Sequence, residues 1–472
     1  MRNNKKAIRR IIAVIFSFIT MLFSFSCADK NTSNESVDSA GNVQESTSEE
    51  EFSLPTYSEK DFVFFGFWSP YDFTEESYTL YKQSGLNTLF FTNHSQEIRN
   101  SDTLHYLGSN ATKLSLELCK KVGLNAIINY GYWYKELAEG VSFSATPFSD
   151  YDLYGEYKDI IVGMHVADEP NINQIPIFGN DTLTNDYKSV YNVPYMVNLY
   201  PSTADWRVTG KDGYRAYVQT YADEVVADFE DNRLLSVDFY PFRKNSFHSG
   251  WLFCYYQVAQ VAKQSGSMQS YYIQTAVGNE FQSSLGVKEI AMQLNVAMSF
   301  GADWFGFYCY EMPRDNAERT PMYDYCMLNP DGTPSPLYYA VQSEIARVSA
   351  FSDVYLSYNW SKTVAVAKDE ETENQALLML GDEDFSNTAI KRATSSEDAI
   401  IGCFNSEYGE AFTVVNYNNP SVETNALVEI EFSKGKYAVV YGINENPQII
   451  EIKDGKISLE LLSGEGLFIT VF

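Results

Sequence analysis

The chain has 472 residues, of which 45% are hydrophobic and 20% are charged, so most of it can bury a core and a mainly disordered protein is excluded. Its 62 acidic and 34 basic residues give a net charge of -28, which repels phosphate backbones and excludes nucleic acid as a partner. The same charge disfavours polyanionic glycans and favours a neutral ligand. Aromatic residues make up 15% of the chain, an enrichment that suits either sugar-stacking surfaces or an ordinary aromatic core.

The first 27 residues have the pattern of an export signal. A basic start is followed by an apolar run from Ile11 to Phe23, and small residues precede Cys27. This order resembles a lipoprotein signal, in which the cysteine becomes the lipid anchor. Ser24 stands where such signals usually carry a branched aliphatic residue, so an uncleaved N-terminal anchor is the alternative. In both cases we expect the body of the protein to lie on the outer face of the cell membrane, held by its N-terminus.

Residues 28–55 are rich in Ser, Asn, Thr, Glu and Asp, and they predict a disordered polar tether. The five later cysteines are dispersed and odd in number, so they imply no disulfide framework, although one bridge is compatible with them. They are Cys119, Cys254, Cys309, Cys326 and Cys403. No CxxC or HExxH motif occurs and the four histidines stand apart, so neither a metal nor another cofactor is predicted. The sequence indicates no obligate protein partner.

Eight strand–helix units follow one another in residues 56–352. The predicted strands are hydrophobic throughout, as parallel strands covered on both faces should be. They are Phe62–Trp68, Thr88–Thr92, Ala126–Tyr130, Ile161–Ala167, Tyr195–Tyr200, Leu235–Tyr240, Ser270–Thr275 and Trp304–Tyr310. Glycines in the "SGLN", "VGLN" and "FGAD" segments mark helix ends that lead into strands. This pattern predicts a (β/α)8 TIM barrel.

A doubly wound open sheet is the alternative to the barrel. It requires a glycine-rich phosphate loop after its first strand, but that place holds Trp68-Ser69-Pro70. The barrel is therefore the preferred prediction.

The pattern changes in residues 353–472, where short strands alternate with turns and predict a C-terminal all-β sandwich domain. The predicted strands are Thr363–Ala367, Gln375–Gly381, Ala399–Phe404, Ala411–Tyr417, Leu427–Glu431, Lys436–Tyr441, Gln448–Ile452 and Gly466–Val471. Asp454-Gly455 is typical of a β-hairpin turn.

The ends of the eight predicted barrel strands carry hydrogen-bonding or aromatic side chains. Because functional groups of such barrels gather at the C-terminal strand ends, these residues predict a site for a polyhydroxylated ligand. The expected substrate-binding residues are Trp68, Asn93, Tyr130, Trp133, Asp168, Asn198, Tyr200, Tyr240, Gln274 and Tyr310. His165 lies within the fourth predicted strand, and for it a buried position in the core is the preferred interpretation.

The fourth strand runs directly into Asp168, Glu169 and Pro170. A carboxyl group beside apolar residues should have a raised pKa, and it is then suited to act as a general acid near neutral pH. The alternative is a structural acid that caps the following helix. Glu169 is the first candidate for a catalytic residue.

The order of elements, the Glu169-Pro170 pair at the fourth strand end and the C-terminal sandwich resemble the clan A glycoside hydrolases. "SVDFYP" at 236–241 is also similar to the sixth-strand segment of several such barrels. The resemblance implies a (β/α)8 fold, hydrolysis of glycosidic bonds with retention, and a general acid/base role for Glu169. The clan usually has Asn before this glutamate, where this chain has Asp168.

The resemblance also implies a nucleophilic glutamate at the seventh strand end, where this chain has Gln274. Three residues are candidates for the second carboxylate. Glu311 is preferred because, like Glu169, it follows a strand and stands just before a proline, on the opposite side of the barrel; Asp238 and Glu280 are the alternatives. One carboxyl group must protonate the leaving oxygen while the other attacks or activates water, at ~5 Å for retention or ~6.5–9.5 Å for inversion.

The sequence therefore predicts a cell-surface glycoside hydrolase that acts on a neutral oligo- or polysaccharide. A catalytically inactive barrel that binds carbohydrate is the main alternative, because the expected glutamate of the seventh strand is missing. A transporter's solute-binding lipoprotein is disfavoured, because that class has two α/β lobes rather than one run of eight units.

Overall fold

The computed structural model describes residues 54–68, 70–91, 104–129, 155–180, 184–185, 187–188, 192–244, 246–248, 250–282, 284–312, 314–315, 320–368, 380, 384–443 and 446–472. Pro55–Phe472 forms one compact unit. The predicted signal, the anchor at Cys27 and the tether up to residue 53 lie outside the described residues, as do Asn93, Tyr130 and Trp133. No helix in the part of the chain that the structure describes has the length and apolar character of a membrane span.

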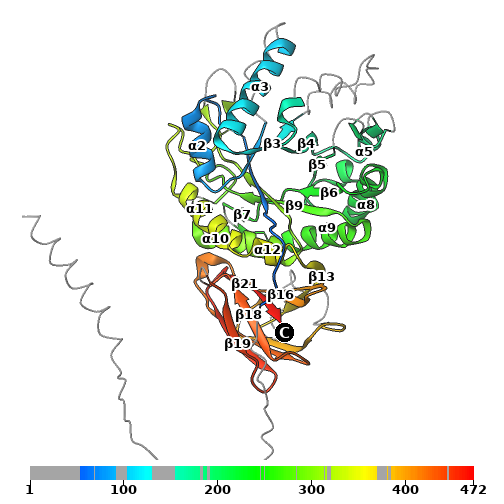
Figure 1. Cartoon of the computed structure of the whole chain (residues 1–472), viewed down its shortest axis with the longest axis vertical. Helices are drawn as coiled ribbons and strands as arrows, with labels where there is room; N and C mark the ends of the chain where they lie inside the picture. The colour runs from blue at the N-terminus through cyan, green and yellow to red at the C-terminus, as the bar shows by residue number, and fades with distance from the viewer. Residues whose placement is uncertain are drawn as a thin grey trace, which may run out of the picture. The chain divides into compact units, whose positions relative to one another are not determined.

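Eight parallel strands close into a barrel, which confirms the predicted fold class (Figure 1). Around the barrel the order is β1, β10, β9, β6, β5, β4, β3 and β2. The strands are β1 (Val63–Phe67), β2 (Thr88–Phe90), β3 (Asn125–Asn129), β4 (Ile161–Asp168), β5 (Tyr195–Leu199), β6 (Leu234–Val237), β9 (Met268–Gln274) and β10 (Trp304–Tyr308). Large apolar side chains such as Phe65, Met196 and Tyr272 fill the interior, so the barrel is a packed core.

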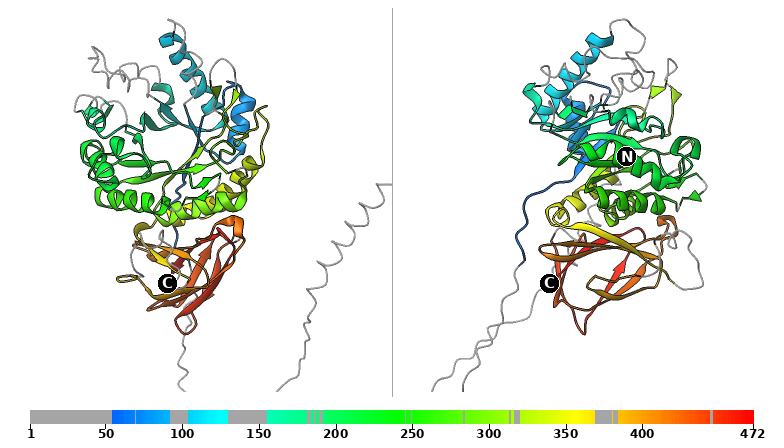
Figure 2. Two further views of the ribbon diagram at one scale, coloured as in Figure 1. Left: turned by 180° about the vertical axis from the view of Figure 1, so that it is seen from behind. Right: turned by 90° about the vertical axis from the view of Figure 1, so that its right-hand side faces the viewer.

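Helices surround the barrel strands, as the two views in Figure 2 show. The longer ones are α2 (Glu75–Gln83), α3 (Leu104–Val122), α8 (Tyr214–Glu224), α9 (Trp251–Ser265), α10 (Val287–Ser299) and α11 (Pro336–Ser349). The short ones are α5 (Ile175–Phe178), α7 (Trp206–Thr209), α12 (Ser352–Tyr355) and the 3-10 turn η2 (Val226–Asp228). Gly85, Gly123 and Gly301 all have positive φ, so each ends a helix in the conformation that the sequence predicted.

Two antiparallel sheets at the C-terminus form the predicted sandwich. Six strands make the first sheet, in the order β13 (Asn359–Val366), β15 (Ala399–Ser406), β16 (Gly409–Asn416), β21 (Gly466–Val471), β18 (Tyr437–Tyr441) and β19 (Gln448–Glu451). Three make the second, in the order β14 (Ile390–Ser395), β17 (Ala426–Phe432) and β20 (Lys456–Leu461), and a 3-10 turn, η3 (Pro420–Val422), precedes β17. Side chains from both sheets form one apolar core.

The structure adds two strands to the sandwich, β14 and β20, that the sequence did not predict. The strand expected at Gln375–Gly381 falls almost entirely outside the described residues. Asp454-Gly455 forms the predicted two-residue turn, with positive φ at both residues and an antiparallel bridge between Lys453 and Lys456. Beyond this bridge the chain passes from β19 in the first sheet to β20 in the second.

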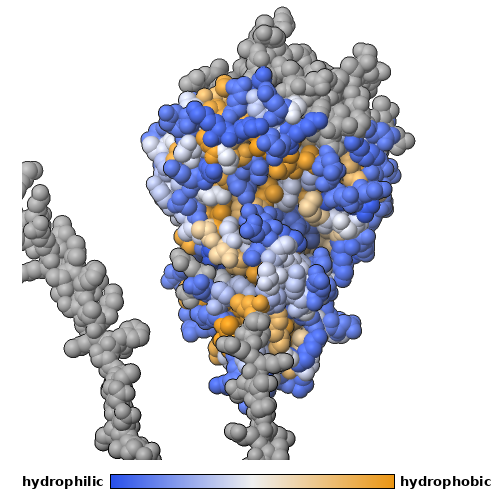
Figure 3. All heavy atoms as spheres, in the orientation of Figure 1, coloured by the Kyte–Doolittle hydropathy of each residue, from blue (hydrophilic) through white to orange (hydrophobic). Residues whose placement is uncertain are grey.

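Helix α10 joins the sandwich to the barrel, since it contacts β9 on one side and β15, β16 and β21 on the other. At its end the Ser299 carbonyl accepts hydrogen bonds from Trp360 Nε1 at 3.0 Å and Thr363 Oγ1 at 2.6 Å. Trp251 of α9 donates to the Tyr417 hydroxyl at 2.6 Å. On the face shown in Figure 3, hydrophilic side chains cover most of the described surface and apolar side chains gather in patches between them.

Candidate active site

A cavity of about 320 Å³ opens at the C-terminal ends of the barrel strands, a volume within the range of ~300–1,000 Å³ that small-molecule sites occupy. Its walls combine carboxylates, aromatic rings and two basic side chains, and they come from the first strand and from strands four to eight with the loops after them. The lining residues are Phe67, Asp168, Glu169, Asn198, Pro201, Thr203, Asp238, Phe239, Tyr240, Arg243, His248, Tyr272, Glu280, Phe281, Tyr308 and Tyr323.

The end of β4 places Glu169 at the cavity. Asp168 is the last residue of the strand, and Glu169 follows in the left-handed region with a φ of 49°. The Glu169 N–H still donates to the Asn198 carbonyl at 2.8 Å, which ties this turn to β5. A side chain that would otherwise continue the alternation of the strand is thereby redirected into the cavity.

The surroundings of Glu169 favour its protonated form. Burial raises its pKa to about 8, and the neighbouring charges of Asp238 and Asp168 act in the same direction. Each effect disfavours the ionised carboxylate, by removing water or by adding like charge. Glu169 therefore holds a proton near neutral pH, as a general acid requires.

Asn198 of β5 connects the two other acids of this wall. Its Nδ2 donates to Asp168 Oδ1 at 3.1 Å and to Asp238 Oδ1 at 3.4 Å, and its Oδ1 accepts from Ser236 Oγ at 3.2 Å. Burial first, and then the charge of Asp168, raises the pKa of Asp238 to about 7, while hydrogen bonds from Asn198 and Tyr240 oppose this rise. One amide thus fixes the positions of both aspartates.

Asp168 differs from Asp238 in exposure. Its side chain is exposed to water at the cavity, although protein atoms surround much of the carboxyl group. This enclosure raises its pKa and the Asn198 hydrogen bond lowers it. Because water still reaches the group, we take the effect of enclosure to be weaker than for Asp238.

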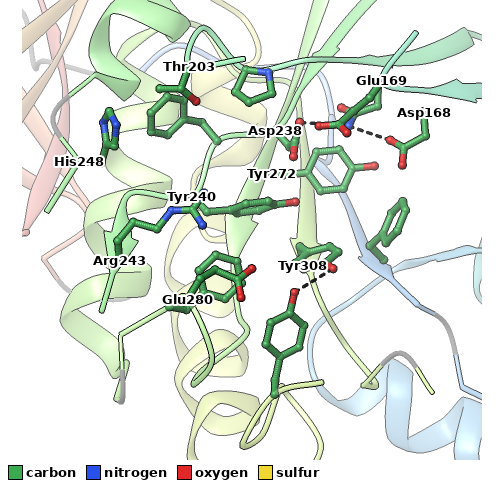
Figure 4. A pocket seen from close by; sticks show the side chains of 16 residues that line it. Asp168, Glu169, Thr203, Asp238, Tyr240, Arg243, His248, Tyr272, Glu280 and Tyr308 are labelled. Atoms are coloured by element: carbon green, nitrogen blue, oxygen red, sulfur yellow. Dashed lines mark hydrogen bonds between the residues drawn. The ribbon is translucent and has the colours of Figure 1, made fainter. Parts of the chain in front are cut away.

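Glu280 lies across the cavity from Glu169, with Tyr240 between them in Figure 4. It belongs to the loop that follows β9, the seventh strand of the barrel in chain order. The cavity wall that carries Glu280 also carries Arg243, whose guanidinium lies 5.0 Å from the centroid of the Phe281 ring. Two carboxylates on opposite walls are the minimum arrangement for acid-assisted cleavage of a glycosidic bond.

Several aromatic residues that sequence reasoning did not single out complete the cavity. Tyr308 hydrogen-bonds to Tyr323 at 3.1 Å, and the ring of Tyr323 stacks on Phe281 with 5.4 Å between centroids. The buried Tyr272 hydroxyl also lines the cavity and has no hydrogen-bond partner among the described residues. Tyr272 and Tyr308 lie in strands whose interior positions the sequence pattern does not distinguish from exterior ones, because both faces are hydrophobic.

Four of the predicted substrate-binding residues lie at or beside the carboxylates. Asp168, Asn198 and Tyr240 line the cavity. The fourth, Tyr200, is close enough to Glu169, Asp168 and Asp238 for their charges to add to burial in raising its pKa. Trp68, also predicted to bind substrate, does not line the cavity; it is partly buried between the barrel core and a second apolar cluster, where it packs near Tyr308.

The structure contradicts the predicted roles of Gln274 and Tyr310. Gln274 is fully buried, with its Oε1 accepting from Phe242 N at 3.0 Å and its Nε2 donating to Phe242 O at 2.9 Å. Tyr310 is 1% exposed and packs edge-on against Tyr81 of α2, away from the residues that line the cavity. Both side chains support the fold.

The sequence prediction that Glu311 is the second carboxylate is also wrong. It does not line the cavity, and its Oε2 accepts the backbone N–H of Tyr71 at 3.0 Å. The reason is that β10 ends at Tyr308, before the predicted end, so the chain has already turned toward the β1–α2 connection at Glu311. Asp238 and Glu280, the alternatives, do line the cavity.

His165 occupies the core position that the sequence favoured. It is 2% exposed within β4 and packs edge-on against Phe90 at 4.9 Å between ring centroids. Burial lowers its pKa to about 3, so it is neutral at physiological pH. Among the described residues no cluster of three His, Cys, Asp or Glu side chains has a geometry that fits a metal ion.

No protein-family model and no curated protein matches the sequence. Among solved structures, the chain is similar to a beta-galactosidase from Bacillus circulans sp. alkalophilus, with a TM-score of 0.48 at 9% identity over 87% of this chain and 99% of that one. It is similar to a family 39 glycoside hydrolase from Bacteroides cellulosilyticus WH2, with a TM-score of 0.43 at 11% identity over 87% of this chain and 81% of that one. It is also similar to a GH30 endoxylanase from Clostridium papyrosolvens C71, with a TM-score of 0.41 at 10% identity over 88% of this chain and 97% of that one.

Proposed function

We propose that this protein is a glycoside hydrolase in which Glu169 is the general acid and Glu280 is the second carboxylate. The observation that carries the proposal is the raised pKa of Glu169 in a cavity that has a second carboxylate on its opposite wall. In this reaction Glu169 gives its proton to the glycosidic oxygen as the bond to the leaving group breaks. The Glu280 carboxylate attacks the anomeric carbon or takes a proton from the attacking water.

Asp238 has a different role in this proposal. It is buried, hydrogen-bonded to Asn198 and next to Glu169, and its charge adds to the effect of burial in raising the pKa of Glu169. We therefore assign it to keeping Glu169 protonated rather than to attack on the sugar. The aromatic rings of Tyr240, Tyr272 and Tyr308 supply faces and hydroxyl groups suited to a neutral sugar.

The first test is hydrolysis of nitrophenyl glycosides and of neutral glycans by the compact unit Pro55–Phe472. We expect turnover that falls by about 10²–10⁴-fold in Glu169→Gln, the usual contribution of a general acid. Glu280→Gln should abolish turnover as well, whereas Glu311→Gln is the matched control and should stay active. Loss of activity in Glu311→Gln but not in Glu280→Gln would refute the assignment of the second carboxylate.

The alternative is a barrel that binds carbohydrate without cleaving it. The observation that favours it is at the seventh strand end, where the resemblance implies a nucleophile. Gln274 stands there, and its side chain is hydrogen-bonded to the backbone of Phe242. Saturable binding of a glycan, with no turnover on any substrate of the panel, would establish this alternative.

We further propose that the protein is exported and anchored through lipid on Cys27. The basic and apolar segments before this cysteine support the proposal. Metabolic labelling with a radioactive fatty acid should mark the full chain and not Cys27→Ser. Equal labelling of the two chains would rule out this anchor.

A further inference from the structure

Cys309 and Cys326 meet beneath the wall of the cavity. Their Sγ atoms are 3.0 Å apart, and both side chains are fully buried. Among the described residues no other pair of thiols is in contact: Cys254, for example, faces the Tyr214 hydroxyl at 3.3 Å. The sequence spacing alone did not distinguish this pair from the other cysteines.

The backbones on either side of the two thiols are hydrogen-bonded neighbours. Met327 N donates to Cys309 O at 3.2 Å, and Leu328 N donates to Tyr310 O at 3.0 Å. These hydrogen bonds hold the two segments together beside the thiols. The sulfurs are already in contact, and they need to approach by only about 1 Å to reach the S–S length of about 2.05 Å in a disulfide.

We propose that Cys309 and Cys326 form a disulfide that fastens the 320–335 loop to the end of β10. Each thiol loses its proton, a bond forms between the two sulfurs, and two electrons pass to an oxidant. The oxidant is a disulfide, either of a thiol–disulfide oxidoreductase or of a small molecule, and it is reduced to two thiols. This inference does not depend on glycosidase activity.

The burial of the two thiols limits when the bond can form. No water reaches either sulfur in the folded protein, and burial holds the pKa of the Cys309 thiol above its usual range. Because the thiolate is the reactive species, oxidation has to occur while the chain folds in an oxidising compartment. Once formed, the disulfide is shielded from reductants until the protein unfolds.

The bond acts on the cavity through the loop that carries Cys326. Three residues before it, Tyr323 lines the cavity, hydrogen-bonds to Tyr308 and stacks on Phe281. On the other side of the bond, Thr275 Oγ1 donates to Cys309 O at 3.2 Å and connects the end of β9 to the pair. The disulfide therefore holds one wall of the cavity against the ends of two barrel strands.

The test is to map the cysteines of the full chain isolated from the producing cells without reductant. Protein denatured in N-ethylmaleimide and digested should yield the Cys309 and Cys326 peptides joined and two mass units lighter than the free pair. Cys119, Cys254 and Cys403 should carry the maleimide. Refolding in a glutathione redox buffer should give the same link.

Maleimide on both Cys309 and Cys326 after both treatments would overturn the proposal, as would a link from either one to another cysteine. A second measurement is the melting temperature, which reduction of the unfolded chain before refolding should lower by roughly 2–5 °C. Cys403→Ala should keep this dependence, and the double variant Cys309→Ala/Cys326→Ala should lose it. If the double variant does not fold, peptide mapping of the unmodified chain decides; equal melting of oxidised and reduced protein would overturn the fastening role.

Discussion

The Glu169 carboxyl is partly enclosed by the cavity wall and lies beside the charges of Asp238 and Asp168, and all three effects raise its pKa. Asp238 is held in turn by Asn198, which also binds Asp168. Protonation of any one of these acids therefore changes the proton affinity of the others. The chemistry of the site belongs to the group of residues rather than to Glu169 alone.

A first prediction concerns the pH dependence of turnover. The rate should fall above about pH 8, where Glu169 loses the proton that the leaving group needs. Asp238→Asn removes a neighbouring like charge while keeping a polar side chain of the same shape, so the alkaline limb should move to lower pH. Initial rates from pH 5 to 10 measure this. Glu465→Gln, far along the chain at the β20–β21 turn, is the control, and an unchanged limb in Asp238→Asn would contradict the coupling.

A second prediction concerns stability. In the folded protein burial raises the pKa of Glu169 from 4.5 to about 8 and that of Asp238 from 3.8 to about 7, so the folded state holds more protons than the unfolded state between these values. Stability should accordingly fall as pH rises from about 4 to 8, by at most about 1.4 kcal/mol per pH unit for each group. Urea unfolding at several pH values should show a flatter profile for Glu169→Gln/Asp238→Asn. A profile as steep as that of the unmodified protein would contradict this account.

At the scale of elements, the end of β9 is occupied by a structural contact. The Gln274 side chain binds both backbone groups of Phe242 in β7 (Phe242–Arg243), which pairs with β8 (Ser246–Phe247). The glutamine amide accepts from the N–H and donates to the carbonyl at once, whereas an ionised glutamate can only accept, so glutamine fits here and ionised glutamate does not. This contact positions Arg243 and the loop that carries Glu280.

Gln274→Glu should therefore destabilise the protein and fail to supply a nucleophile. The new carboxylate would be buried against the Phe242 carbonyl, at a cost of about 2–4 kcal/mol in the free energy of unfolding. Gln282→Glu makes the same change at a partly exposed loop position, where we expect an effect within about 0.5 kcal/mol. Chemical denaturation compares the two, and a gain of activity or stability in Gln274→Glu would show the amide contact to be unimportant.

At the scale of the whole molecule, the sandwich and the barrel share a close contact at the end of α10. The backbone of Gly402 in β15 approaches so closely that an added Cβ would lie 2.6 Å from Ser299 O and 2.5 Å from Thr413 Oγ1. These atoms also take part in the hydrogen bonds that join the two parts. The barrel and the sandwich therefore behave as one packed body at this point.

Gly402→Ala should lower the stability of the whole unit by about 1–3 kcal/mol, the usual cost of overpacking. Calorimetry should show a single transition at a lower temperature, because barrel and sandwich share the contact. Gly155→Ala is the matched control, since its added Cβ would meet nothing within 4 Å. Equal melting of the two variants would mean that the interface yields to the extra methyl group.

The sequence by itself determined the barrel, the sandwich that follows it, and Glu169 as an acid at the fourth strand end. These features follow from local patterns: apolar runs of strand length, helix-end glycines such as Gly301, and a carboxylate directly after a buried strand. Such patterns depend on neighbours along the chain, so they can be read without knowing the packing.

Tertiary structure decided which distant residues meet. Glu280 lines the cavity and Glu311 does not, although Glu311 repeats the pattern of Glu169, because β10 ends before the sequence pattern suggests. Packing between distant segments also brings the Gln274 side chain to the backbone of Phe242 and the Cys309 thiol to that of Cys326. Loop paths after the strands set these contacts, and loop paths depend on packing across the whole barrel end rather than on the residues of one segment.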